Sequence, residues 1–153
     1  MSAGTGERVY SESTSTDPTP WIEKIAKSDS VIVIAQGVLQ YWRHEEVKRL
    51  FSAAALSAPY VHILFDSMAP PLVHVNNKKN KTIRLCPDYK WSVWNTSRIG
   101  DGEDFRVDVI DEKNFMDMDK SVKEHMPFKD RIIYGAPVIR NFYRMTFAQV
   151  CPA

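Results

Sequence analysis

VIVIAQGVLQYWRHEEVKRLFSAAALSAPYVHILFDSMAP, residues 31–70, carries two apolar segments on either side of a helical pattern. The first segment, at 31–35, is β-branched without polar alternation, which predicts a strand covered on both faces by helices. From 44 to 57 the apolar residues recur at helical spacing, and glutamates occupy the favourable first turn. Pro59 ends this helix, and 60–66 predicts a second strand. Strand, helix and strand in this order predict a right-handed βαβ unit and therefore an α/β fold.

The residues before this unit divide into two parts. The first 20 residues include twelve Ser, Thr, Gly or Pro and few apolar side chains, so they cannot bury enough surface to offset the entropy of ordering. Trp21, Ile22 and Ile25 then predict about two turns of helix. We therefore expect a disordered Ser/Thr-rich tail at 1–20 and a single domain at 21–153.

Beyond residue 70 the pattern is less regular. Pro70 and Pro71 can open a short helix, whereas 76–81 and 88–104 are expected to be mainly loop. Alternation at 105–109 predicts a half-exposed strand. A helix is expected between 128 and 139, and 142–150 predicts the last strand.

Composition excludes several classes of protein. With 153 residues, 44% of them hydrophobic, the chain fits one globular domain and is too apolar to be disordered. A formal net charge of +1 provides no general field for nucleic acid or an anionic membrane, and no apolar run approaches the roughly 20 residues that span a bilayer. Cys86 and Cys151 form neither a disulfide framework nor a metal quartet. We expect reduced thiols and a cytoplasmic protein without nucleic-acid or membrane partners.

Common catalytic and metal-binding motifs are missing from the sequence. Neither G-x-G-x-x-G nor G-x-x-x-x-G-K-[ST] occurs, so a self-contained nucleotide site is not expected. The serines have no G-x-S-x-G setting, and the histidines lack the spacing of metal ligands. His62 lies inside an apolar strand, where a hydrogen-bonded core histidine is the favoured interpretation. We read the basic residues at 78–84 as a solvated face.

The end of the first strand is a candidate binding position. In an open parallel sheet, ligands bind outside the carboxyl ends of the strands. Gln36, Gly37 and Tyr41 follow the first strand here. Gly37 would permit close approach of a ligand to the backbone, or it is a plain turn glycine.

The end of the second strand brings a second group to the same edge. Asp66, with Ser67 and Met68 after it, either accepts a hydrogen bond from a ligand or caps the next turn. Trp91 and Trp94 lie in a loop beyond the crevice that is expected at the carboxyl ends of these two strands. They could form the wall of an apolar pocket, although a plug at the edge of the core is the favoured interpretation.

One family resemblance accounts for these motifs together. At IVIAQGVLQYWRHEEVKRLF (32–51) and HILFDSMAP (62–70) the sequence resembles the leucine carboxyl methyltransferase family, which includes the tetracenomycin-type polyketide O-methyltransferases. The family pattern is a hydrophobic strand, A-E-G-V-L-x-Y-[LF], a helix rich in Glu, Val and Leu, and a strand ending in F-D-[ST]-x-[SA]-P. A weaker match extends over residues 9–150.

The resemblance implies a fold and a cofactor. Family members have a seven-stranded Rossmann-like class I methyltransferase sheet and use S-adenosyl-L-methionine. This chain looks like the carboxyl-terminal half, with four strands that correspond to the fourth to seventh of that sheet and a last strand that runs antiparallel. The glycine-rich loop and the acidic residue that grips the ribose would precede Met1, so a truncated protein is expected.

The resemblance also implies roles for the candidate residues. Gln36 falls where the family has a glutamate that helps to hold the methionine end of the cofactor, and Gly37 follows it in the motif. Tyr41 falls on the motif tyrosine at the mouth of the active site and is the candidate catalytic residue. Glutamine lacks the charge of glutamate, so weaker cofactor binding is expected.

A substrate pocket is also expected from the resemblance. Its residues would be Asp66, Ser67, Met68 and Trp91, none of which is an indispensable acid or base.

Two functions follow as expectations. The first is methyl transfer to a carboxylate or a polyketide-like hydroxyl, on a small molecule or a carboxyl-terminal carboxylate, with weak or no activity of this chain alone. The second is a non-catalytic remnant that serves as a protein-interaction module. The expected partners are a complementary amino-terminal half, or a second copy associating through the edge of the strand at 31–35.

Overall fold

The computed structural model describes residues 30–83, 87–114 and 141–153, together with 117, 124–125, 127–129 and 132. The tail expected at 1–20, the helix expected near Trp21 and most of the helix expected between 128 and 139 lie outside the described residues.

Four strands form one mixed sheet: β1 (Ser30–Ala35), β2 (Tyr60–Met68), β3 (Phe105–Asn114) and β4 (Tyr143–Pro152). Their order is β1-β2-β4-β3, so β1 and β3 are the edges of the described sheet. β1 is parallel to β2, whereas β4 is antiparallel to both β2 and β3. The predicted α/β class, the four strands and the reversal of the last one are confirmed.

The βαβ unit at 30–68 is confirmed. Its helix, α2 (His44–Ser57), has the predicted bounds. At its start the Glu46 side chain accepts a hydrogen bond of 2.6 Å from the Arg43 N–H, which satisfies a donor that the helix leaves open. At its end Ala58 is extended, with φ −156° and ψ 158°, as the residue before a proline prefers.

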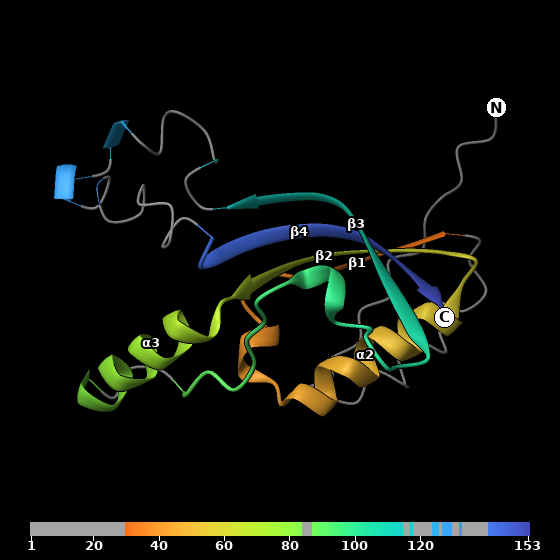
Figure 1. The fold of residues 1–153 in the computed structure, drawn as a ribbon, viewed down its shortest axis with the longest axis horizontal. Helices are drawn as coiled ribbons and strands as arrows, with labels where there is room; N and C mark the ends of the chain where they lie inside the picture. Colours follow the sequence, from red (N-terminus) through yellow and green to blue (C-terminus); the bar gives the residue numbers. More distant parts are fainter. Residues whose placement is uncertain are drawn as a thin grey trace, which may run out of the picture.

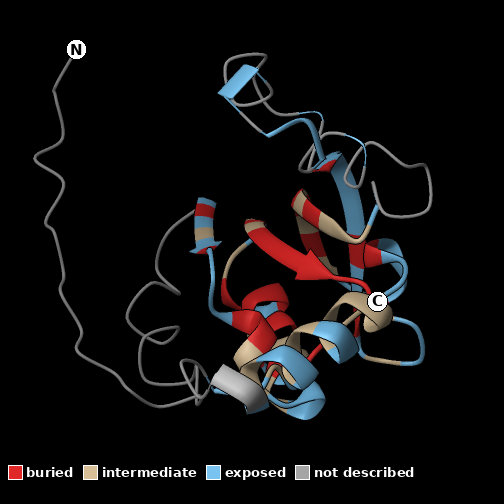
Figure 2. Ribbon diagram, turned by 90° about the vertical axis from the view of Figure 1, so that its left-hand side faces the viewer, coloured by how far each residue is buried: buried red, intermediate tan, exposed pale blue. Residues whose placement is uncertain are grey.

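The described helices lie on one side of the sheet (Figure 1). Side chains from α2 and from the facing strands form the core, in which Phe51 contacts Phe65 edge-on at a centroid distance of 5.4 Å and stacks on Phe105 at 5.9 Å. The buried segments gather where the sheet meets these helices (Figure 2). The sheet and α2 therefore make a two-layer core.

The expectation that helices cover both faces of β1 is wrong. Val31 and Ala35 are 9% and 8% exposed, but Ile32 and Ile34 on the other face are 64% and 67% exposed. The physical reason is that α2 packs on one face, while no described element packs on the other. His62 lies on that second face of β2 and is half-buried against Phe147, with ring centroids 5.3 Å apart, so it is not the core histidine that we expected.

The second helix is longer than expected. Pro70 does begin it, but α3 (Pro70–Ile83) also includes 76–81, which we expected to be loop. Asn77 shows why. Its amide donates to the Tyr89 carbonyl and accepts from the Tyr89 N–H, both at 2.8 Å, so a tertiary contact outweighs the low helix propensity of asparagine. The helix leaves Lys78 and Lys79 exposed, in agreement with a solvated face.

The remaining segments differ from those expected from the sequence mainly in their length. β2 continues past Asp66 to Met68, and β3 continues past 109 to Asn114. Residues 87–104 are loop apart from a short 3-10 helix, η2 (Thr96–Arg98). β4 agrees with the predicted last strand.

Candidate functional site

A buried carboxylate joins three elements at the carboxyl ends of β1 and β2. Asp66 is 0% exposed. Its Oδ1 accepts a hydrogen bond of 2.7 Å from the Gly37 N–H, and its Oδ2 accepts one of 2.7 Å from the Tyr143 hydroxyl. Asp66 therefore ties the turn after β1 to the first residue of β4. It belongs to β2 and does not cap the turn that follows.

The turn after β1 needs glycine. Gly37 has φ +68°, in the left-handed region that side chains disfavour, and an added Cβ would meet nothing within 4 Å. The positive φ supports the turn interpretation of Gly37. The open space beside it is what close approach of a ligand requires. Gln36, immediately before it, is exposed.

Tyr41 lies on a short 3-10 helix beyond this turn, η1 (Leu39–Tyr41). Its ring contacts that of Tyr89, with centroids 5.1 Å apart. The Gln40 carbonyl accepts hydrogen bonds from the N–H groups of Lys90 and Trp91 at 2.7 and 3.2 Å. The loop after α3 therefore holds η1, and with it Tyr41, near the carboxyl end of β1.

The four residues expected in the substrate pocket are buried. Asp66 and Ser67 are 0% exposed, Met68 is 6% exposed and Trp91 is 1% exposed. Trp91 packs in the core, with its ring centroid 6.3 Å from that of Phe65, which is the position expected of a core plug. Side chains placed in this way have almost no surface to offer a substrate. The exposed candidates at this edge are Gln36 and Gly37.

Tyr143 belongs to the site although the sequence analysis did not single it out. Burial, reinforced by the hydrogen bond to Asp66, raises the pKa of the Tyr143 hydroxyl well above its usual range. Tyr143 therefore stays protonated near neutral pH and acts as a hydrogen-bond donor to Asp66. No local signal marked it, because its partner is 77 residues away.

Arg144 is a second residue that the sequence analysis missed. Its guanidinium donates to the carbonyls of Trp94 and Val93 at 2.8 and 2.7 Å and lies 3.6 Å from Glu112. Thr146 donates to the same Glu112 carboxylate at 3.0 Å. This network fixes the loop at 91–98 against the sheet. The available signal was the one charged residue in the predicted last strand.

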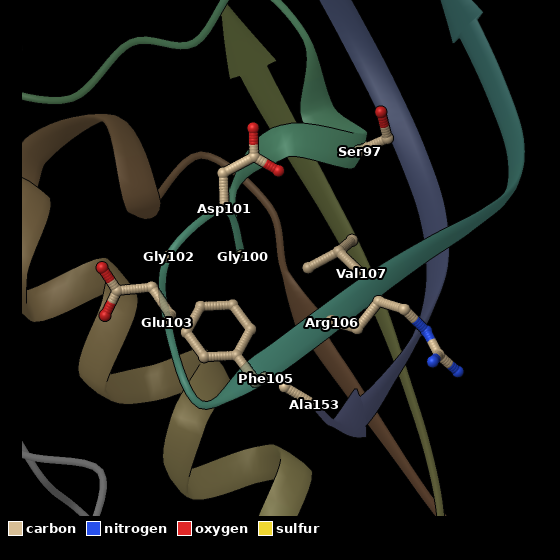
Figure 3. A pocket seen from close by; sticks show the side chains of 9 residues that line it. All are labelled: Ser97, Gly100, Asp101, Gly102, Glu103, Phe105, Arg106, Val107 and Ala153. Atoms are coloured by element: carbon tan, nitrogen blue, oxygen red, sulfur yellow. The ribbon is translucent and has the colours of Figure 1, made fainter.

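The described hollows lie elsewhere. One, of about 400 Å³, opens at the amino end of β3, where Phe105 and Val107 meet the loop at 100–103 (Figure 3). Another, of about 370 Å³, lies beside α2 between Arg49 and Asp104. β3 begins beside the end of β4, so both hollows lie at the end of the sheet opposite to the Gly37 turn.

Two further findings concern metal ligands and membrane-spanning helices among the described residues. No group of three or more His, Cys, Asp or Glu among them could hold a metal ion. Likewise, none of the described helices is long and apolar enough to cross a membrane.

Comparisons with known proteins give a distant structural likeness. No family model matches the chain, and no curated protein matches it. Among solved structures it is similar to magnesium protoporphyrin IX methyltransferase from Synechocystis PCC 6803 with bound SAH, at 14% identity and a TM-score of 0.41. The alignment covers 84% of this chain and 48% of the matched chain, so this chain spans about half the length of the matched protein. A likeness this distant adds nothing to the fold already described.

Proposed function

We propose that this chain forms one wall of an S-adenosylmethionine site and belongs to an O-methyltransferase. The observation that carries the proposal is the Gly37 turn. It lies at the carboxyl end of a parallel strand, it has a positive φ, and the buried Asp66 fixes it by a hydrogen bond of 2.7 Å. The family pattern noted in the sequence covers the same residues.

Gln36, Gly37 and the half-buried Tyr41 each have a task in this proposal. The Gln36 carbonyl oxygen accepts a hydrogen bond from the ammonium group of the cofactor, and the bare backbone of Gly37 lets the methionine end approach. Tyr41 borders the space for the methyl acceptor. Asp66 and Tyr143 act through the turn and are positioning residues.

The chemistry needs little acid or base help from the protein. When bound, the cofactor would supply a sulfonium methyl group. The new O–CH3 bond would form as the S–CH3 bond breaks, S-adenosylhomocysteine would leave, and a hydroxyl acceptor would release its proton to water. The protein orients the two reactants and excludes water. A carboxylate or a polyketide-like hydroxyl is the proposed acceptor.

The chain alone should bind the cofactor weakly. This sequence has no glycine-rich loop for the rest of the cofactor. We propose that a complementary amino-terminal half supplies that part of the site, and that this chain alone is weak or inactive. The cytoplasmic location remains a prediction from the sequence.

A titration followed by two-dimensional NMR tests the proposal. S-adenosylmethionine added to the isotopically labelled chain should shift the amide signals of 36, 37 and 41 at lower ligand concentrations than it shifts those of β3. Adenosine, which lacks the amino-acid end, should leave them unchanged. Gln36→Glu should strengthen binding by up to about tenfold, because a charge-assisted hydrogen bond is roughly twice as strong as a neutral one.

Gln149→Glu is the matched control. It makes the same chemical change on β4, toward the other end of the sheet, and should leave binding unchanged. If Gln36→Glu leaves the affinity for S-adenosylmethionine unchanged, or if the signal shifts are confined to β3, the Gly37 turn is not part of the cofactor site.

A non-catalytic interaction module is the second candidate. The exposed Ile32 and Ile34 favour it, since an exposed apolar patch that none of the described elements covers is typical of a contact site. A chain that shows no shift with any adenosine-containing ligand but associates through β1 would support this second function.

A further inference from the structure

We propose that β1 pairs antiparallel with β1 of a second copy of this chain, in a register centred on Val33. The contact would join two four-stranded sheets into one. It concerns the outer edge of β1, and in this register Gln36 lies opposite Ser30 of the second copy, next to the Gly37 turn.

The first observation is an unguarded edge. Within the described sheet β1 pairs only with β2, so its outer N–H and C=O groups face away from every described strand. Its sequence, SVIVIA, has no charged residue and no proline. Such an edge is a template for pairing with another strand.

The second observation is the exposed face beside that edge. Ile32 and Ile34 are 64% and 67% exposed on the face away from α2. On the same face of the next strand, Leu64 and His62 are half-buried, and the His62 ring stacks on Phe147 of β4. The apolar surface therefore begins at the edge of the sheet and continues inward.

The opposite edge of the sheet looks different. β3 exposes charged side chains along its length, among them Arg106, Asp108, Asp111 and Lys113. It also has an irregularity in its pairing with β4 between Val109 and Asp111. Charges and bulges are the devices that protect an edge strand, so association between sheets is directed to β1.

A second copy suits the β1 edge better than a charged partner. The strand presents no charge that would attract an acidic or a basic chain. In a two-fold contact the same strand meets itself, and here no like charges come together. In a register centred on Val33, Ile32 lies opposite Ile34 of the second copy, and the same pair forms again across the axis. The helix layers then stay on one side and the isoleucine stripes merge on the other.

A register shifted by one residue would be worse. Ile32 would lie opposite Val33 of the second copy, and Val33 packs toward the core on the other face. Because a one-residue shift exchanges the two faces of a strand, the helix layer of one copy would then lie on the exposed side of the other. The register centred on Val33 avoids this.

Two lysine variants test the surface. Ile32→Lys with Ile34→Lys should weaken self-association by about tenfold or more, because two apolar pairs are lost and like charges face each other. Ile110→Lys is the matched control, since Ile110 is 54% exposed on β3 and should leave association unchanged. Light scattering over about a hundredfold range of protein concentration gives the readout, and melting curves verify that each variant folds.

A cysteine experiment tests the register. In a background with Cys86→Ser and Cys151→Ser, Ile32→Cys is mixed with a size-tagged Ile34→Cys variant and oxidised. A mixed disulfide that exceeds either homodimer supports the proposal. Its absence in a chain that does dimerise overturns the register.

Three other outcomes overturn the proposal itself. A wild-type chain that stays monomeric at every concentration shows that no second copy binds. Equal loss of association in Ile110→Lys places the contact elsewhere. A complementary polypeptide that adds a strand at β1 and dissolves the dimer would make that polypeptide the true occupant. The cofactor titration is carried out on the dilute chain, where self-association does not contribute to the NMR shifts at 36 and 37, so this proposal and the proposed function can fail separately.

Discussion

The two faces of β1 show how differently one apolar strand can be used. Toward α2, Val31 and Ala35 are almost fully buried and belong to a core that continues through Phe51. Toward the other side, Ile32 and Ile34 are about two-thirds exposed (64% and 67%). An uninterrupted apolar sequence therefore shows that a strand tolerates burial on both faces, but it does not show how many layers cover the strand.

The covered face should dominate the stability of the fold. Phe51→Ala removes a ring that is 0% exposed and contacts two other aromatic side chains, so the free energy of unfolding should fall by about 3–5 kcal/mol. Leu56→Ala on the same helix is the control. Leu56 is 70% exposed, so the change should stay within about 0.5 kcal/mol. Urea denaturation measures both, and a small loss for Phe51→Ala would contradict the two-layer core.

Loss of the hydrogen bond from Tyr143 to Asp66 should cause the next largest fall in the free energy of unfolding. Tyr143→Phe leaves one oxygen of a fully buried carboxylate without its donor, which should cost about 1–3 kcal/mol. Tyr60→Phe, at a side chain that is 60% exposed, is the matched control and should be nearly neutral. A neutral Tyr143→Phe would show that the three elements are held together without this bond.

The same bond makes a prediction about alkaline pH. The folded state raises the pKa of Tyr143 above its value of about 10 in the unfolded chain. The protonated hydroxyl therefore stabilises the fold fully below about pH 10, and this stabilisation is lost as the pH rises further. The stability difference between wild type and Tyr143→Phe should therefore narrow as the pH rises above about 10. Unfolding measured across this pH range gives the test. A difference that widens instead would have the wrong sign for a raised pKa.

The turn after β1 should contribute a smaller amount. Gly37→Ala places a side chain at φ +68° without any clash, so it should cost about 1–2 kcal/mol from backbone strain alone. Gly37→Asn should cost less, because asparagine tolerates this conformation better. Equal stability of both variants and wild type would mean that the turn relaxes freely.

The elements encoded by local signals could be predicted from the sequence. The bounds of α2 follow from its periodicity, from Glu46 and from Pro59, all of which act within a few residues. Features made by distant contacts could not be predicted. Asp66 meets Tyr143 across 77 residues, and the pairing of Asn77 with Tyr89 keeps α3 helical through a polar segment. Each depends on how segments that are distant in the sequence pack against one another.

The smallest effect is expected on the exposed face of β1. Ile34→Thr keeps a β-branched side chain at a site that is 67% exposed, so the stability of the dilute protein should change by no more than about 0.5 kcal/mol. Thermal unfolding at low protein concentration measures it. A loss of several times that size would mean that this face is covered.

Amide hydrogen exchange at several protein concentrations tests most directly whether β1 is an open edge. The amides of 61–65, a part of β2 that has a neighbouring strand on each side, should be strongly protected at every concentration. The outward amides of 31–35 should exchange quickly in dilute solution and become protected as the concentration rises. Strong protection of the outward amides of β1 in a dilute monomer would show that this edge is already covered, and would contradict the account.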